Sequence, residues 1–349
     1  MNDKFFKLPL EKQRRIINAA YKVFSENSYK KAPMSEIADE SGISKALLFH
    51  YFTNKKELYM YLWMNAIEMT RKAVTEYKTL ETDDFFEMLK RSLLSKCSLK
   101  KGKIMLYYDE YGSKENPTIM LLHGAGALDT FCRQYCFSDK YHLIVPHLAG
   151  AGKAATEIYE PEKTVEELFV LIKTLHKKRI GVIGHSLGGQ IAIMLVSKQP
   201  KLFDFAVFLS AWVNPKPNTI RMYCSLAGLS AKMLHWRWLV QFQGKYWNYT
   251  KKQADNMAEY SKQITPQVYD SFFSNTLDLS KLPEYQAVTI PMLAICGSKE
   301  VRNMKISLTL LAQNPNCQTM ILQGANHDFP MRNAKQLNPM LEKFISECL

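Results

Sequence analysis

The spacing of apolar residues changes once along this 349-residue chain, near residue 100, and that change constrains the fold more than any single motif. Up to about residue 98, apolar residues recur at three- and four-residue intervals, as on amphipathic helices. One such stripe consists of Ile16, Ile17, Ala20, Val23 and Phe24. After a basic break at 100–103, short strand-like runs alternate with helical stretches. We therefore expect two domains, an all-helical one over 1–100 and an α/β one over 101–349.

Seven apolar runs in the second part have the length and composition of buried strands. They are Ile104–Tyr108, Thr118–Leu122, His142–Val145, Ile180–Ile183, Phe205–Leu209, Pro291–Cys296 and Thr319–Leu322. Helical stretches such as 165–176 lie between them, and a strand that returns parallel to its neighbour needs such a crossover. This order predicts a doubly wound, mostly parallel sheet with helices on both faces.

Charge and composition narrow the class of protein. The net charge is +13, and residues 1–103 hold 20 Lys or Arg against 13 Asp or Glu. A polyanionic partner is therefore sought in the N-terminal part. The seven cysteines are scattered, no apolar run is long enough to span a bilayer, and the first residues do not resemble a signal peptide. We expect a cytoplasmic protein with reduced thiols, no membrane partner, and neither a metal nor an organic cofactor.

Residues 34–52 have the pattern of a helix-turn-helix. A short helix is predicted over Ser35–Glu40, a tight turn at Ser41-Gly42-Ile43, and a second helix over Lys45–Phe52 that Ser44 caps. Glycine suits the turn because it adopts a positive φ without steric cost. In this motif the second helix enters the major groove of DNA. The helices flanking the motif are expected to continue to about residue 98.

Residues 10–62 resemble the DNA-binding domain of the TetR family. The resemblance is strongest from Ile37-Ala38 through Gly42-Ile43-Ser44-Lys45-Ala46-Leu47-Leu48-Phe49-His50-Tyr51-Phe52 to Lys55 and Leu58, and 83–96 is similar to the family's fifth helix. The resemblance implies a homodimer that reads a palindromic operator. It places Lys45, Ala46 and His50 near base edges, and Ser44, Tyr51 and Lys55 near phosphates. Phe49 departs from the commoner tyrosine, and Ala32-Pro33 stands where the family has a Thr or Ser cap. The alternative is a helical appendage that binds a protein.

The most informative motif of the second part is Gly184-His185-Ser186-Leu187-Gly188, which follows the run Ile180–Ile183 and precedes a helical stretch. Gly-x-Ser-x-Gly between a strand and a helix is typical of a nucleophile elbow. The turn requires small residues beside the serine, and the helix N-terminus lies under its oxygen. The context predicts that Ser186 is a nucleophile, and a purely structural turn is the alternative.

Residues 102–349 resemble the α/β-hydrolase superfamily, which implies a sheet of about eight strands with the site at the strand ends. The resemblance assigns an oxyanion hole to two backbone amides, that of Ala125 in His123-Gly124-Ala125-Gly126 and that of Leu187. His123 is interpreted as structural. The loop His147–Gly152 departs from the family, which usually has an aspartate and a basic loop there.

The same resemblance assigns the rest of a triad. Glu300 lies three residues past Gly297 at the end of an apolar strand, where the family has its acid, and His327 follows the last strand. The order Ser186, Glu300, His327 is the hydrolase order. As alternatives, Glu300 is a solvated loop carboxylate with Asp328 nearby as the acid, and His327 is a surface histidine.

Residues 212–286 are rich in aromatic residues and methionine, and we expect them to form a helical cap over the serine. An apolar cap suggests a lipophilic ester or acyl ligand, although aromatic residues at helical spacing also simply pack together. The two parts indicate a ligand-responsive transcription regulator whose sensor is a serine hydrolase of the carboxylic-ester type. Two alternatives stay open: a sensor without catalysis, and a carboxylesterase whose N-terminal helices serve oligomerisation or protein contact.

Overall fold

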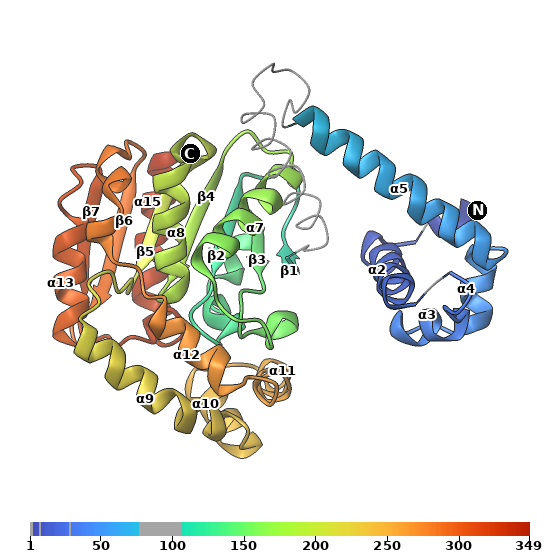
Figure 1. Ribbon diagram of the computed structural model, residues 1–349. Helices are drawn as coiled ribbons and strands as arrows, with labels where there is room; N and C mark the ends of the chain where they lie inside the picture. Colours follow the sequence, from blue (N-terminus) through green and yellow to red (C-terminus); the bar gives the residue numbers. More distant parts are fainter. Residues whose placement is uncertain (1–2, 7, 28, 77–105) are drawn as a thin grey trace. The chain divides into compact units, whose positions relative to one another are not determined.

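A computed structural model of the protein describes residues 3–6, 8–27, 29–76 and 106–349 (Figure 1). The chain divides into two compact units, Met1–Met105 and Leu106–Leu349. The predicted fifth helix at 83–96, the basic break at 100–103 and the boundary near residue 100 lie outside the described residues. Within the described ranges, no helix is long and apolar enough to cross a membrane.

The described part of the first unit is all helical. Its helices are α1 (Asp3–Phe6), α2 (Leu10–Glu26), α3 (Met34–Glu40), α4 (Lys45–Tyr51) and α5 (Lys55–Glu76). The predicted apolar stripe of α2 lies in the core, where Ile16 and Val23 pack with Ile37 of α3 and Leu48 of α4. Burial of this stripe, rather than intrinsic helix propensity, accounts for most of the stability of helices this short.

The helix-turn-helix forms as its sequence predicts. Gly42 has a φ of 64°, the left-handed conformation that favours glycine. The Oγ of Ser44 accepts a hydrogen bond from the backbone N–H of Leu47 at 3.2 Å, which caps α4. The helix α3 begins after Pro33 without a side-chain cap. The helix α4 ends at Tyr51, one residue earlier than predicted, because Phe52 has extended backbone.

The second unit is built on a seven-stranded sheet in the order β1-β3-β2-β4-β5-β6-β7 (Figure 1). β1 is antiparallel to β3, and the other neighbouring pairs are parallel. Residues of β2, β3, β4 and β6 are buried throughout, which explains their continuous apolar composition. The strands are β1 (Tyr108–Tyr111), β2 (Thr118–Leu122), β3 (His142–Pro146), β4 (Ile180–His185), β5 (Phe203–Leu209), β6 (Met292–Gly297) and β7 (Cys317–Leu322).

Two sequence expectations about the sheet differ from the structure. The resemblance implies about eight strands, and the described residues form seven. Of the first strand expected over Ile104–Tyr108, positions 104 and 105 lie outside the described residues; Leu106 and Tyr107 are not in a strand, and β1 begins at Tyr108 and continues to Tyr111. This strand is a half-exposed edge that pairs with β3, so polar residues are tolerated in it, and a search for apolar runs places it too early.

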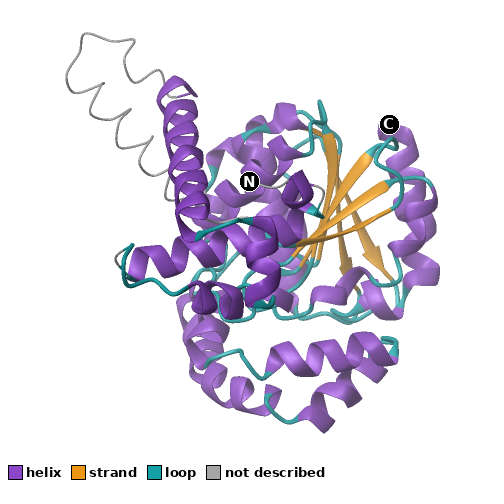
Figure 2. Ribbon diagram, turned by 90° about the vertical axis from the view of Figure 1, so that its right-hand side faces the viewer, coloured by secondary structure: helices purple, strands orange, loops and turns teal. Residues whose placement is uncertain are grey.

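Helices cover both faces of the sheet, as Figure 2 shows. They are α7 (Pro161–Thr174), α8 (Leu187–Lys198), α13 (Arg302–Leu311), α14 (Phe329–Arg332) and α15 (Ala334–Cys348). The helix α8 is buried from Leu187 to Ser197 and packs on β2, β4 and β5. Its N-terminus is therefore held rigidly at the carboxyl end of β4. Short 3-10 segments complete the connections: η1 (Leu128–Phe131), η2 (Tyr135–Asp139), η3 (Gly152–Ala154), η4 (Pro200–Leu202), η5 (Leu279–Lys281) and η6 (Pro283–Ala287).

A helical insertion separates β5 from β6. It consists of α9 (Pro217–Leu234), α10 (Arg237–Tyr246), α11 (Lys251–Ser261) and α12 (Pro266–Ser274). The helix α9 packs against α12, and α10 packs against α11. In Figure 1 these helices form a group at one end of the sheet.

Candidate functional site

The turn between β4 and α8 holds Ser186 in a strained conformation. Its φ is 52° and its ψ is −114°, a region that residues with a side chain rarely occupy, and such strain costs about 1–3 kcal/mol. Its backbone N–H donates a hydrogen bond of 2.8 Å to the carbonyl of Leu209. A Cβ at Gly184 would lie 2.1 Å from the carbonyl oxygen of Gly188, and a Cβ at Gly188 would lie 1.9 Å from that of Leu122. Both flanking positions therefore require glycine.

Two loops at the carboxyl edge of the sheet bring Glu300 and His327 together. The Nδ1 of His327 lies 2.7 Å from Oε2 of Glu300. The Glu300 side chain is only 2% exposed, and its Oε1 accepts hydrogen bonds of 2.6 Å from Oγ of Ser210 and from the backbone N–H of Gly297. The imidazole is 44% exposed. With Nδ1 engaged by the carboxylate, Nε2 is the ring nitrogen left to exchange a proton.

The surroundings of Glu300 keep it charged. Burial on its own raises the pKa of Glu300, but the hydrogen bonds from His327, Ser210 and Gly297 and the charge of His327 outweigh burial, so that its pKa is lowered. By contrast, the neighbouring carboxylate of Asp328 makes no side-chain hydrogen bond or ion pair among the described residues. The backbone carbonyl of Asp328 accepts hydrogen bonds from the first turn of α14. The geometry therefore pairs His327 with Glu300 and not with Asp328.

Sequence reasoning missed two residues that support this pair. Ser210, with a φ of 50°, directly follows β5, and its hydroxyl holds Glu300 from the side opposite His327. His185 is buried, and its Nε2 donates a hydrogen bond of 2.8 Å to the carbonyl of His327. Burial lowers the pKa of His185 to about 3, so the ring is neutral. In the sequence, both residues could have been found as polar residues at the end of a predicted strand.

The loop after β2 lies against Ser186. A Cβ at Gly124 would be 3.7 Å from the Cβ of Ser186. Among the described residues, the backbone amides of Ala125 and Leu187 donate no hydrogen bond, so both can serve a ligand. His123 is buried, accepts a hydrogen bond from the N–H of Leu148 at Nε2, and donates from Nδ1 to the carbonyl of Gly124 at 2.7 Å. It holds two loops together, in agreement with its interpretation as structural.

The helical insertion is fastened to this loop. The hydroxyl of Tyr260, on α11, donates to the carbonyl of Gly126 at 3.1 Å and accepts from the N–H of Leu128 at 3.3 Å. The Nε2 of Gln253 donates to Asp129 at 3.0 Å. No hydrogen bond joins Ser186 to His327 in the described part of the chain. Catalytic hydrogen bonds are often long without substrate and shorten when it binds.

The candidate DNA contacts gather around α4. Ser44, Lys45, Ala46 and His50 are exposed on it. Tyr51 is 6% exposed, so most of its ring lies in the core. Lys55 is half-buried.

Lys55 is the phosphate-contact candidate whose position is best defined. Its Nζ donates a hydrogen bond of 3.3 Å to the carbonyl of Lys30 and lies 5.1 Å from the centre of the Tyr29 ring. Both contacts hold the ammonium group beside the start of α5, close in sequence to the exposed residues of α4.

Each of the two units contains a match to a known protein family. The α/β hydrolase fold model matches residues 117–334, and the model of bacterial regulatory proteins of the tetR family matches residues 16–62. The chain belongs to the α/β hydrolase fold family. In this hydrolase-family chain, residues 16–62 of the first unit thus match the DNA-binding domain of the tetR family.

Individual relatives agree with this division. Lipase 1 of Psychrobacter immobilis is 30% identical over 131 residues, which cover 34% of this chain and 41% of the lipase. The HTH-type transcriptional activator FasR of Mycolicibacterium smegmatis is 33% identical over 79 residues, 22% of this chain and 36% of FasR. The chain thus spans less than half the length of either relative. The enol-lactonase of Burkholderia xenovorans LB400 superposes on this α/β-hydrolase with a TM-score of 0.57 at 18% identity, covering 69% of this chain and 96% of the enzyme.

Proposed function

We propose that the protein is a ligand-responsive transcription regulator whose sensor is a serine hydrolase of lipophilic esters or acyl compounds. The observation that carries the catalytic half is the contact of His327 with the buried carboxylate of Glu300, 2.7 Å apart, at the same sheet edge as the strained Ser186. The tetR-family match over residues 16–62 carries the DNA-binding half. Neither half alone accounts for the chain.

The proposed reaction is an acyl transfer through Ser186. His327 takes the Ser186 proton at Nε2 while the serine oxygen attacks the substrate carbonyl, and it later returns the proton to the leaving group. Glu300 orients the ring and stabilises its positive charge. The backbone amides of Ala125 and Leu187 donate to the oxygen that becomes negative in the tetrahedral intermediate. A water molecule then attacks the carbonyl of the acyl-enzyme while His327 takes its proton, and collapse of this second intermediate releases the acid and returns the proton to Ser186.

The proposed ligand is lipophilic because the helical insertion supplies apolar side chains above the loop after β2. Phe272 lies so close to Gly150 that a Cβ there would be 2.3 Å from the ring. Ile264 lies 3.9 Å from the Cβ position of Gly126, beside the proposed oxyanion loop. The name of the similar lipase supports an ester class. A sensor without catalysis is the second candidate, and labelling of Ser186 by a fluorophosphonate distinguishes the two.

Covalent occupation of Ser186 should change operator affinity. An operator selected from random duplexes would be titrated with protein labelled by an alkyl fluorophosphonate and with unlabelled protein. A coupling of about 1–3 kcal/mol predicts a change of roughly 5- to 150-fold. Ser186→Ala protein exposed to the same reagent is the matched control and should bind as untreated protein does. Equal operator affinities of labelled and unlabelled protein would contradict a sensor role, because a ligand shifts only an equilibrium between states that it binds unequally.

The DNA contacts predict two different mutant phenotypes. Lys55→Ala should weaken binding to all duplexes alike, because a phosphate contact carries no base information. It should also lower the slope of log affinity against log salt concentration by about one. Lys45→Ala should change which sequences are preferred. Binding would be measured by fluorescence anisotropy over a salt series, with exposed Lys201→Ala, on the other unit, as control. Unchanged binding by both variants would show that α4 does not dock as proposed.

A further inference from the structure

The helical insertion carries many exposed apolar side chains that the proposed chemistry does not use. Half of the exposed large apolar side chains described in Leu106–Leu349 fall within residues 222–246. Six of them define what we call the aromatic face: Met222, Leu226, Met233, Trp236, Trp238 and Phe242. Isolated exposed apolar residues are ordinary, but a cluster of this kind marks a site of interaction.

The aromatic face is built into the helices and is not a consequence of loose packing. On α10, Val240 and Gly244 point into the protein, while Trp238 and Phe242, one turn apart, are each 66% exposed. The Trp236 and Trp238 rings stack with their centres 6.3 Å apart and their planes at 15°. Met222, Leu226 and Met233 recur at helical spacing along the outer side of α9.

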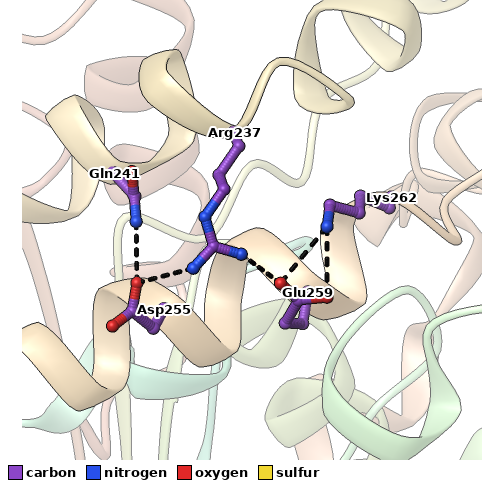
Figure 3. Close-up of polar contacts among 5 residues, drawn as sticks. All are labelled: Arg237, Gln241, Asp255, Glu259 and Lys262. Carbon is purple, nitrogen blue, oxygen red and sulfur yellow. Dashed lines mark hydrogen bonds and ion pairs between the residues drawn. The ribbon is translucent and has the colours of Figure 1, made fainter.

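Ion pairs fix a neighbouring side of α10, about 100° around the helix from Trp238 and Phe242. Arg237 binds Asp255 at 2.9 Å and also Glu259, both on α11, and Gln241 donates to Asp255 at 2.7 Å (Figure 3). Lys262 binds Glu259 at 3.2 Å. These contacts hold α10 against α11, so the aromatic face is kept outward instead of folding onto its own neighbours.

The charge of the sequence that carries the aromatic face is positive, while the neighbouring helices supply Asp255 and Glu259, which pair with Arg237, and Asp270, which lies beside Cys224 of α9. Residues 205–254 contain seven Lys or Arg and no Asp or Glu. Arg237 is paired within the insertion, which leaves six exposed cations: Lys216, Arg221, Lys232, Lys245, Lys251 and Lys252. Lys245 lies on the same side of α10 as Trp238 and Phe242. At the end of α10, the guanidinium of Arg332 stacks on the Tyr246 ring at 4.1 Å and adds a further positive charge.

We propose that the aromatic face docks on an anionic lipid surface. Exposed Trp, Phe and Met beside Lys and Arg are the composition that lies in the interface of a bilayer, with apolar side chains among the acyl chains and cations at the headgroups. A second copy of this chain is disfavoured, because a symmetric contact would bring the same unpaired cations together. A nucleic acid would satisfy the cations but would leave the outer side of α9 without an apolar partner.

This inference does not depend on turnover at Ser186. It also revises the expectation of no membrane partner, which rested on the lack of an apolar run long enough to span a bilayer. Binding at a surface needs no such run. The sequence places the aromatic residues in the cap. Whether they point inward or outward depends on which side of α10 packs against α11.

The test is sedimentation of the full-length protein with sucrose-loaded vesicles. Vesicles of phosphatidylcholine with phosphatidylglycerol should retain the protein, and pure phosphatidylcholine vesicles should retain much less. Lys232→Gln/Lys245→Gln should lower partitioning onto the anionic vesicles by about 25-fold, at about fivefold per cation. Trp238→Ala/Phe242→Ala should lower it by about tenfold or more. Both pairs are exposed, so the fold should persist.

Matched controls separate this surface from general charge and hydrophobicity. Trp63→Ala removes an equally exposed tryptophan of the first unit, and Lys201→Gln/Lys305→Gln removes two exposed cations elsewhere on the second. These controls should partition as the parent does. Failure to bind anionic vesicles, or equal loss in test and control variants, would overturn the proposal. The proposal would also be overturned if the aromatic-face variants bound vesicles as the parent does. In that case the loss would be confined to binding of random duplex DNA, or to self-association measured by ultracentrifugation.

Discussion

Replacing Ser186 with alanine is expected to abolish covalent labelling by a fluorophosphonate and to lower ester turnover by about a thousandfold or more. The hydroxyl is the only group at the elbow that can form the acyl intermediate. The φ of 52° holds Ser186 in a conformation that residues with a side chain rarely adopt, as expected of a nucleophile elbow. Loss of a nucleophile removes the covalent route entirely, whereas binding and the oxyanion amides remain.

Labelling would be followed by intact-protein mass spectrometry, and turnover with p-nitrophenyl esters of increasing chain length. Ser210→Ala is the matched control, because Ser210 is also a strand-end serine with a positive φ, but its hydroxyl donates a hydrogen bond to the acid Glu300. It should still be labelled. A folded parent protein that resists labelling at every concentration would favour the sensor without catalysis.

Much of the fold was predictable because its signals are local. Gly42 and Ser44 specify the turn and cap of the helix-turn-helix through their own backbone and side-chain chemistry. The elbow is similar, since Gly184 and Gly188 are required by contacts with atoms within the same motif and its neighbouring strand. The parallel strands were recognisable because burial on both faces makes them continuously apolar. The edge strand β1 has no such signal and was placed too early.

The rest of the site depends on contacts between residues far apart in the sequence. The interaction of Ser210 with Glu300 joins positions 90 residues apart, and that of His185 with the His327 carbonyl joins positions 142 apart. No spacing rule encodes such distances. The family resemblance indicated which loops carry the triad, but it did not indicate that Ser210 also binds Glu300. The exposure of Trp238 likewise depends on a distant contact, because the ion pair of Arg237 with Asp255 fixes which side of α10 packs against α11.

Glu300→Gln is expected to lower turnover by about four orders of magnitude while leaving the fold intact. The hydrogen bonds of the carboxylate decide how a glutamine must lie at this position. Ser210 and Gly297 both donate to one oxygen, so a glutamine must place its amide oxygen there and turn its NH₂ toward His327. Nδ1 of His327 then has to accept a hydrogen bond, which puts the ring proton on Nε2. In that tautomer the ring cannot take the proton of Ser186.

The same substitution distinguishes the two carboxylates. Asp328→Asn is the matched control, and it should keep nearly full activity because no described residue binds the Asp328 side chain. Turnover and the rate of fluorophosphonate labelling should fall together in Glu300→Gln, since both need His327 to accept the serine proton. Full activity in Glu300→Gln with loss in Asp328→Asn would assign the acid to Asp328. That result would require His327 to leave the carboxylate that it contacts at 2.7 Å.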